Sequence, residues 1–282
     1  MKNLTVRLLT AAIAVPLILA LLYLCPWWGF ASLAGAAMIV AALEFFGMTH
    51  AGDRSSQLVG TAITAALFAV LVWTDFGRRS AGLVIVSLVA LAPVALVVTL
   101  VRPGDVTTSL VRMASLALGP AYVGSSLAAI ACIRRLEVPG HHHVGAGLVL
   151  LSLMAAWFGD TGGYFAGRGI GGPKLYPTVS PNKTWAGAVG GLAGSGLGAA
   201  FAHFVYLPEL PLVRGLAVAV VAGALGQIGD LCESLLKRST GVKDSGGILP
   251  GHGGILDRVD ALLFVALAVY GAARAGWLGL PL

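Results

Sequence analysis

Several polar side chains recur on one face of an apolar segment around residue 230. They follow one another at intervals of three or four residues, as Gln227, Asp230, Ser234 and Lys237. A helix would place all of them on one face. A carboxylate inside a membrane costs about 2.5 to 3.5 kcal/mol on insertion scales unless it is paired or bound to a metal. We therefore expect Asp230 to have a partner and this face to end in positive charge.

A glycine-rich polar loop follows this segment. From residue 239 it reads STGVKDSGGILPGHGGILDRVD, with glycines at Gly246, Gly247, Gly251, Gly253 and Gly254. Glycine lets successive backbone N–H groups turn toward an anion, as they do in phosphate-binding loops. Asp257 and Asp260 are spaced i, i+3 and would face the same side of the next helix. The loop is therefore a candidate phosphate-binding segment.

A second polar window covers residues 160–184. Asp160, Tyr164 and Arg168 are spaced i, i+4, i+8 and would share one helical face. The following segment, KLYPTVSPNKT at 174–184, carries groups that can bond phosphate oxygens, namely Lys174, Ser180, Asn182 and Lys183. A basic loop that only faces lipid headgroups would have the same composition. This window alone leaves both interpretations open.

The two windows together are compatible with three kinds of protein. Hard oxygen ligands on separate helices, surrounded by Lys and Arg, suit a polyphosphate bound with Mg²⁺. The spacing also allows an ion-coupled transporter that uses Asp160, Asp230 and Asp257, or a purely structural cluster of ion pairs. The glycine-rich loop and the clustering of basic residues on one side of the membrane favour phosphoryl chemistry.

The elements that position these residues are membrane helices. Of the 282 residues, 57% are hydrophobic and 11% charged, whereas a soluble domain has about 25% charged residues. Only helices satisfy their own backbone over apolar runs of about 20 residues without alternation. We predict an all-α polytopic integral membrane protein with about nine transmembrane helices, at residues 8–25, 27–49, 58–74, 81–101, 113–133, 145–167, 185–206, 213–233 and 255–278.

Charge and polarity indicate the organisation of the chain. Residues 1–144 are mostly spans, whereas 145–282 form a C-terminal catalytic region with cytoplasmic loops 168–184 and 234–254. With the N-terminus inside, most of the 18 Lys and Arg residues face the cytoplasm, although the pairs Arg78-Arg79 and Arg134-Arg135 lie outside. The net charge of +6 indicates anionic lipid or phosphate partners, and no nucleic acid is expected. We predict a protein of the cell (inner) membrane with its active site facing the cytoplasm.

The C-terminal half resembles a known family. The stretch SLLKRSTGVKDSGGILPGHGGILDRVD at 234–260 is similar to the signature of the phosphatidate cytidylyltransferases, S-x-x-K-R, then K-D, then P-x-H-G-G-x-x-D-R-x-D. WFGDTGGYFAGR at 157–168 and SPNKTWAG at 180–187 resemble a second region of that family. Ala186 departs from the pattern, because many relatives carry Glu or Gln after the Trp. The N-terminal half agrees only in having many spans.

The resemblance implies a nucleotidyltransferase of phospholipid biosynthesis that makes CDP-diacylglycerol and pyrophosphate from CTP and phosphatidate. It also implies a Mg²⁺ cofactor held by Asp230 and Asp257, with room for a second ion, and a homodimer in the lipid bilayer. We predict Asp230, Asp257, Lys243 and Arg258 as catalytic residues. The predicted substrate-binding residues are Asp160, Tyr164, Arg168, Lys174, Ser180, Asn182, Lys183, Thr184, Ser234, Lys237, Arg238, Asp244, His252 and Asp260. A CTP-dependent enzyme that acts on another lipid phosphate stays open as an alternative.

Overall fold

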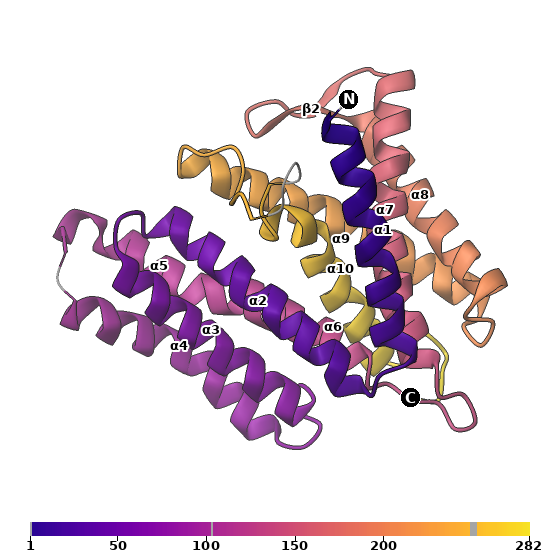
Figure 1. The fold of residues 1–282 in the computed structure, drawn as a ribbon, viewed down its shortest axis with the longest axis horizontal. Coiled ribbons are helices and arrows are strands. Elements are labelled where there is room, and N and C mark those ends of the chain that lie inside the picture. The colour runs from indigo at the N-terminus through magenta and orange to yellow at the C-terminus, as the bar shows by residue number, and fades with distance from the viewer. Residues whose placement is uncertain (1, 103, 249–252) are drawn as a thin grey trace. The chain divides into compact units, whose positions relative to one another are not determined.

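The described residues form a series of helices and a small β-hairpin (Figure 1). The computed structural model describes residues 2–102, 104–248 and 253–282, with side chains from residue 12 onward. The elements in chain order are α1 (Lys2–Tyr23), α2 (Trp27–Thr49), α3 (Arg54–Thr74), α4 (Ala81–Val101), the 3₁₀ turn η1 (Val106–Thr108), α5 (Ser109–Gly119), the π-helical turn η2 (Pro120–Gly124), α6 (Ser125–Ile133), α7 (Val144–Gly169), β1 (Lys174–Tyr176), β2 (Ser180–Thr184), α8 (Trp185–Val205), α9 (Leu212–Ser239) and α10 (Leu256–Arg274).

Most of these helices are long and apolar enough to cross a bilayer. Within the described ranges seven helical segments meet both criteria, one of them the continuous run Val106–Ile133, and Ala12–Tyr23 is a shorter apolar helix. α10 is not among these segments, and it carries Asp257, Arg258 and Asp260 in its first turns. The predicted all-α membrane fold is confirmed, and the expected number of about nine spans is approximate.

One compact unit comprises residues 1–17, 28–132 and 244–258. Phe45 and Phe46 of α2 are fully buried in its core. Two glycines of neighbouring helices meet these rings: a Cβ at Gly60 or at Gly119 would lie only 2.5 Å from the ring of Phe46. Glycine therefore allows α3 and α5 to approach α2 closely. Pro120, which lacks an N–H donor, follows at the start of the π-helical turn.

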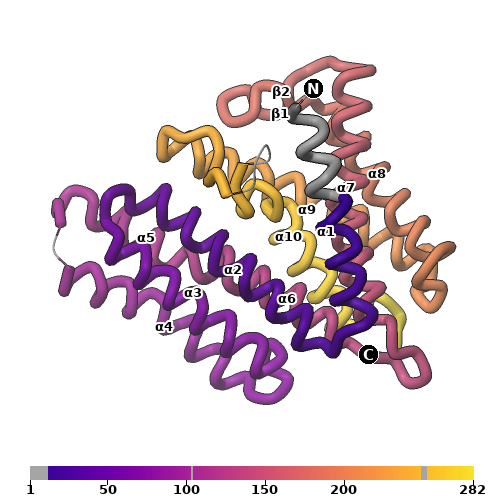
Figure 2. The backbone as a smooth tube through the Cα atoms, in the orientation of Figure 1, coloured from indigo at the N-terminus to yellow at the C-terminus, as the bar shows by residue number. Residues whose placement is uncertain are grey.

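The second compact unit comprises residues 18–27, 133–243 and 259–282. Within it, α7 leads into the hairpin of β1 and β2, which returns the chain to α8 (Figure 2). α7 and α8 pack backbone against backbone, because a Cβ at Gly194 would overlap the carbonyl oxygen of Phe158. The hydroxyl group of Ser195 donates a hydrogen bond of 2.8 Å to the carbonyl oxygen of Ala155 across the same contact.

The ends of this unit differ in their polar contacts. At one end His141 pairs with Glu209 at 2.8 Å, so the start of α7 adjoins the α8–α9 connection. Arg134, which precedes α7, donates hydrogen bonds to the carbonyl oxygens of Leu22 and Cys25 at 2.9 and 3.2 Å. The other end, where α7 finishes, carries the hairpin. Arg134 thus has a local structural role at the end of α1, although the positive-inside rule disfavours basic residues on its predicted side of the membrane.

Two predicted loop regions contain regular structure. The segment 168–184 includes the last turn of α7 and both strands, in which Lys174 pairs with Thr184 and Tyr176 with Ser180. α9 continues to Ser239, so residues 234–239 are helical rather than part of a loop. The ion pair between Glu233 and Lys237, at i and i+4, supports this helical extension.

The contact between α7 and α8 generates a first prediction. Gly194→Ala should lower the free energy of unfolding by about 1 to 3 kcal/mol, because the new methyl group overlaps the backbone of Phe158. Gly196→Ala on the same helix is the matched control, since its methyl group would lie 3.6 Å from Val220, an ordinary contact. The measurement is the thermal unfolding midpoint of each purified variant in detergent. Equal midpoints would contradict the proposed close packing.

Candidate active site

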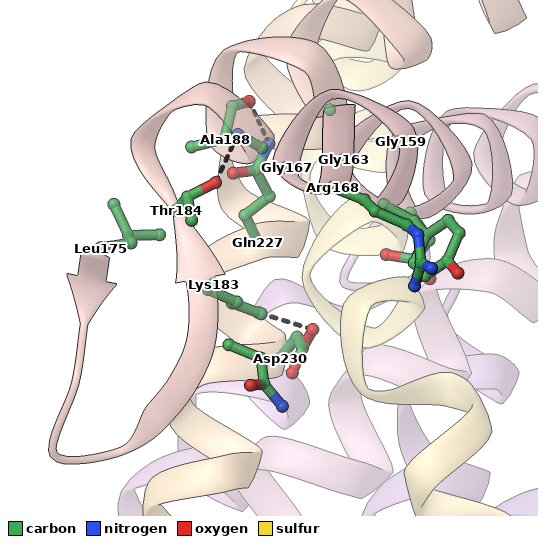
Figure 3. Close-up of a pocket in the computed structure, with 15 residues that line it drawn as sticks. Gly159, Gly163, Gly167, Arg168, Leu175, Lys183, Thr184, Ala188, Gln227 and Asp230 are labelled. Carbon is green, nitrogen blue, oxygen red and sulfur yellow. Dashed lines mark hydrogen bonds and ion pairs between the residues drawn. The ribbon is translucent and has the colours of Figure 1, made fainter. Parts of the chain in front are cut away.

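A cavity of about 670 Å³ lies in the second unit, between the C-terminal half of α7, the hairpin, α8 and α9 (Figure 3). Its polar lining residues are Asp160, Tyr164, Arg168, Asn182, Lys183, Thr184, Gln227 and Asp230. All of them except Gln227 are among the site residues predicted from the sequence. The structure therefore brings the window 160–184 and the polar face of α9 together in one cavity.

Glycines form much of the wall of this cavity. They come from one face of α7 and from the start of α8, as Gly159, Gly163, Gly167, Gly187 and Gly191. A Cβ at Gly191 would lie 2.7 Å from Nε2 of Gln227. That amide group donates a hydrogen bond of 3.0 Å to the carbonyl oxygen of Ala188, which ties α9 to α8. The small residues leave open space and expose the helix backbone beside the charged groups.

An ion pair joins two elements across the cavity. Nζ of Lys183 in β2 lies 2.6 Å from Oδ2 of Asp230 in α9, and both side chains are partly exposed (Figure 3). The hydroxyl group of Ser234 donates a longer hydrogen bond of 3.4 Å to Oδ1 of Asp230. The expectation that Asp230 has a partner is thus confirmed. Because the pair is accessible from the cavity, each member can also meet a charged ligand.

The hairpin fixes the position of Lys183. Its turn residue Val179 is buried, with 3% of its surface exposed, which anchors the turn. At the other end of β2, Oγ1 of Thr184 accepts a hydrogen bond of 3.0 Å from the backbone N–H of Gly187 and so caps α8. Lys183 therefore stands between an anchored turn and a capped helix.

The carboxylates of the second unit fit a magnesium ion that is bound together with phosphate. Asp160 and Asp230 line the same cavity, and the carboxyl group of Asp260 in α10 interacts electrostatically with both. Mg²⁺ is usually held by one or two carboxylates, water and substrate phosphates rather than by a complete protein cage. In the described part of the chain, no group of three or more His, Cys, Asp or Glu residues is arranged to hold a metal.

Asp257 belongs to the first unit, where backbone and hydroxyl donors surround its carboxylate. Its Oδ2 accepts hydrogen bonds from the N–H of Ser245 at 2.9 Å, the hydroxyl of Ser245 at 3.0 Å and the N–H of Gly254 at 2.9 Å. These bonds hold the carboxylate at the first turn of α10. Whether Asp257 shares a metal ion with Asp230 stays a prediction from the family signature.

The other predicted residues have different surroundings. Lys237 pairs with the buried Glu233, and Arg238 donates a hydrogen bond of 3.2 Å to the carbonyl oxygen of Val242. Among the described residues, several predicted ones do not line the cavity: Lys174, Ser180, Ser234, Lys237, Arg238, Lys243, Asp244, Asp257, Arg258 and Asp260. His252 lies outside the described residues. Binding roles for this group stay predictions.

Two polar residues gain roles that sequence reasoning did not assign. Gln227 was recognised only as part of a polar face, yet its amide group joins two helices in the cavity wall. Glu44 of α2 accepts a hydrogen bond of 3.0 Å from the hydroxyl group of Ser245 in the signature segment. A lone carboxylate in an apolar span is the one sequence signal that singles out Glu44.

The chain is similar in sequence to several phosphatidate cytidylyltransferases. A phosphatidate cytidylyltransferase of Brucella suis is 42% identical over 155 residues, 55% of each chain. One from Bacillus subtilis is 41% identical over 135 residues, 48% of this chain and 50% of the relative. One from Haemophilus influenzae is 39% identical over 140 residues, 47% of this chain and 49% of the relative.

The chain spans about half the length of the curated relatives it matches. The model of the cytidylyltransferase family matches a longer stretch, residues 5–275. It thus covers nearly all of the helices described above. The family resemblance predicted from the sequence is confirmed: the chain belongs to the cytidylyltransferase family.

Proposed function

We propose that this protein transfers the cytidylyl group of CTP to phosphatidate, forming CDP-diacylglycerol and pyrophosphate. The observation that carries this proposal is the cavity of the second unit, which presents Arg168 and Lys183 beside Asp160 and Asp230. Cations suit the phosphates of two anionic substrates, and carboxylates suit a metal ion. The names of the relatives support the same reaction, and family membership supports an enzyme rather than a transporter.

In the proposed reaction a phosphate oxygen of phosphatidate attacks the α-phosphorus of CTP. A new P–O bond forms, the bond from the α-phosphorus to the bridging oxygen breaks, and pyrophosphate leaves with the electron pair. The nucleophile is already an anion at neutral pH, so a strong general base is not required. The main task is to hold two anions together and to stabilise charge on the leaving group. Lys183 and Arg168, which line the cavity, would supply the positive charge for this.

We propose Mg²⁺ as the cofactor, with Asp230 and Asp257 as the ligands assigned by the family signature. Asp160, which shares the cavity with Asp230, is a further oxygen donor for the same purpose. When bound, the ion would supply charge neutralisation to the phosphates. If Asp230 held such a cation, the ammonium group of Lys183 would be released from this ion pair and could bind a phosphate oxygen instead.

We also propose a homodimer in the cell membrane with the cavity open to the cytoplasm. CTP is a cytosolic nucleotide, so a site that uses it must face that side. In the second unit, the hairpin and the cavity lie at one end, whereas His141 and Glu209 lie at the other. The apolar helices supply the membrane setting.

The substrate prediction concerns the lipid headgroup. Purified protein with CTP and Mg²⁺ should release pyrophosphate and form a CDP-lipid with phosphatidate, whereas diacylglycerol should give no product because it lacks the phosphate nucleophile. Product formation is measured by pyrophosphate release and by lipid chromatography. Both assays are run over a panel of phospholipids and isoprenoid phosphates. Preference for an isoprenoid phosphate would favour the alternative lipid substrate, and comparable turnover with diacylglycerol would overturn the lipid-phosphate mechanism.

The next prediction tests Asp230. Asp230→Asn keeps the shape but removes the charge, so turnover should fall by about two orders of magnitude or more, as losses of charge stabilisation at active sites do. Glu209→Gln is the matched control, because Glu209 is also a partly exposed acid in an ion pair of the same unit but lies outside the cavity. The measurement is Mg²⁺-dependent turnover per folded molecule. Near-normal turnover of Asp230→Asn would remove Asp230 from the proposed metal site.

Membrane sidedness gives a further prediction. In a background without Cys25, Cys132 and Cys232, new cysteines at the exposed positions Thr178 and Ser239 should react with an impermeant thiol reagent only from the cytoplasmic side. A cysteine at exposed His142, at the opposite end of α7, should react only from outside. Labelling of Thr178→Cys and Ser239→Cys from opposite sides would refute the proposed orientation.

A further inference from the structure

Glu44 occupies an unusual position for a carboxylate in an apolar helix. It lies near the end of α2 and is half-buried. Its Oε1 accepts a hydrogen bond of 3.0 Å from the backbone N–H of Ile255, and its Oε2 accepts one of 2.8 Å from the N–H of Leu256. Within the described part of the chain, no Lys, Arg or His forms an ion pair with Glu44. Backbone and hydroxyl donors stabilise this charge.

The donors that Glu44 uses are those that a helix leaves unpaired. The first N–H groups of a helix have no partner inside it, and the helix dipole adds partial positive charge there. Leu256 is the first residue of α10, so Glu44 satisfies the start of that helix from a position 212 residues away in the chain. Charge-assisted hydrogen bonds of this kind are stronger than neutral ones. They attach the start of α10 to α2.

Two glycines of the signature segment enclose the Glu44 carboxylate. A Cβ at Gly246 would lie 2.5 Å from Oε1 of Glu44, and a Cβ at Gly254 would overlap Oε2. The sequence predicts that the glycines of this loop make room for an anion. At Gly246 and Gly254 the neighbouring anion is a side chain of the protein itself. These two glycines therefore serve to admit Glu44.

Ser245 connects Glu44 to Asp257. Its hydroxyl oxygen lies 3.0 Å from Oε2 of Glu44 and 3.0 Å from Oδ2 of Asp257. A hydroxyl group donates a single proton, so the two carboxylates compete for it. The position and charge of Glu44 thus influence how the Asp257 carboxylate is held.

We propose that Glu44 is a positioning residue that holds the start of α10 and, through Ser245, sets the orientation of Asp257. This inference rests on the proposed function, in which Asp257 is a metal ligand. Glu44 acts through the segment and contacts neither substrate. It explains why an acid is present in α2, far in sequence from the family signature.

The test compares Glu44→Gln with wild-type protein by hydrogen exchange and kinetics. Gln provides one acceptor oxygen in place of two, so the amides of Ile255 and Leu256 should exchange faster, while α7 and α8 keep wild-type exchange. The kcat should fall roughly tenfold or more, with KM for CTP unchanged. Asp53→Asn is the control, because Asp53 is also a carboxylate at a helix start of this unit, where it accepts a bond of 3.0 Å from Ser56. It should keep wild-type kcat and exchange at Ile255.

Ser245→Ala separates the two parts of the inference. It removes the hydroxyl group that joins Glu44 to Asp257 but leaves the backbone N–H bond of residue 245 to Asp257 and both backbone bonds of Glu44, so kcat should fall while Ile255 and Leu256 stay protected. If Glu44→Gln does not fold, the kcat of Ser245→Ala still tests the inference. Wild-type kcat and exchange in Glu44→Gln, or wild-type kcat in Ser245→Ala, would overturn the inference. If the wild-type protein makes no CDP-lipid, the proposed function fails, and the exchange data still test the contact itself.

Discussion

Carboxylates in apolar surroundings are the constraint on which this structure depends. An ionised acid is stable there only when a cation or several hydrogen-bond donors compensate its charge. The protein uses three arrangements. Asp230 pairs with Lys183 of the hairpin, Glu233 pairs with a lysine one turn along its own helix, and Glu44 binds backbone N–H groups at a helix start. Each arrangement joins or stabilises the elements that carry the candidate active site.

The location of its ion-pair partner distinguishes a structural acid from a candidate functional one. Glu233 is 1% exposed and its lysine is close along the same helix, so that pair contributes mainly to the stability of α9. Asp230 and Lys183 come from different elements and remain accessible from a cavity of about 670 Å³. A pair of that kind is able to exchange partners when a charged substrate enters. Exposure and cavity geometry, rather than residue type, distinguish the two cases.

Glycine allows a close contact with a polar group in two places. Between α7 and α8 it allows the backbones to meet, so that Gly194 lies against the carbonyl group of Phe158 and a cavity forms beside the contact. In the signature segment, Gly246 and Gly254 allow a carboxylate to reach backbone N–H groups. In both places a polar group occupies the space that a larger side chain would fill. These glycines therefore allow contacts that a larger side chain would prevent.

The apolar runs by themselves determined the helices, because a chain in lipid must satisfy its backbone locally. The i, i+4, i+8 spacing likewise determined that Asp160, Tyr164 and Arg168 share a face, and the cost of a buried charge required a partner for Asp230. These properties depend on neighbouring residues alone, and the structure agrees with them.

Only the tertiary structure decided which groups meet. The partner of Asp230 is a lysine on a hairpin that composition did not reveal, and the start of α10 is satisfied by Glu44, 212 residues earlier. Periodicity reports which face of a helix is polar, but it contains no information about which face of another helix packs against it. That choice depends on close approach at glycines and on the pairing of charges, both of which are properties of the folded chain.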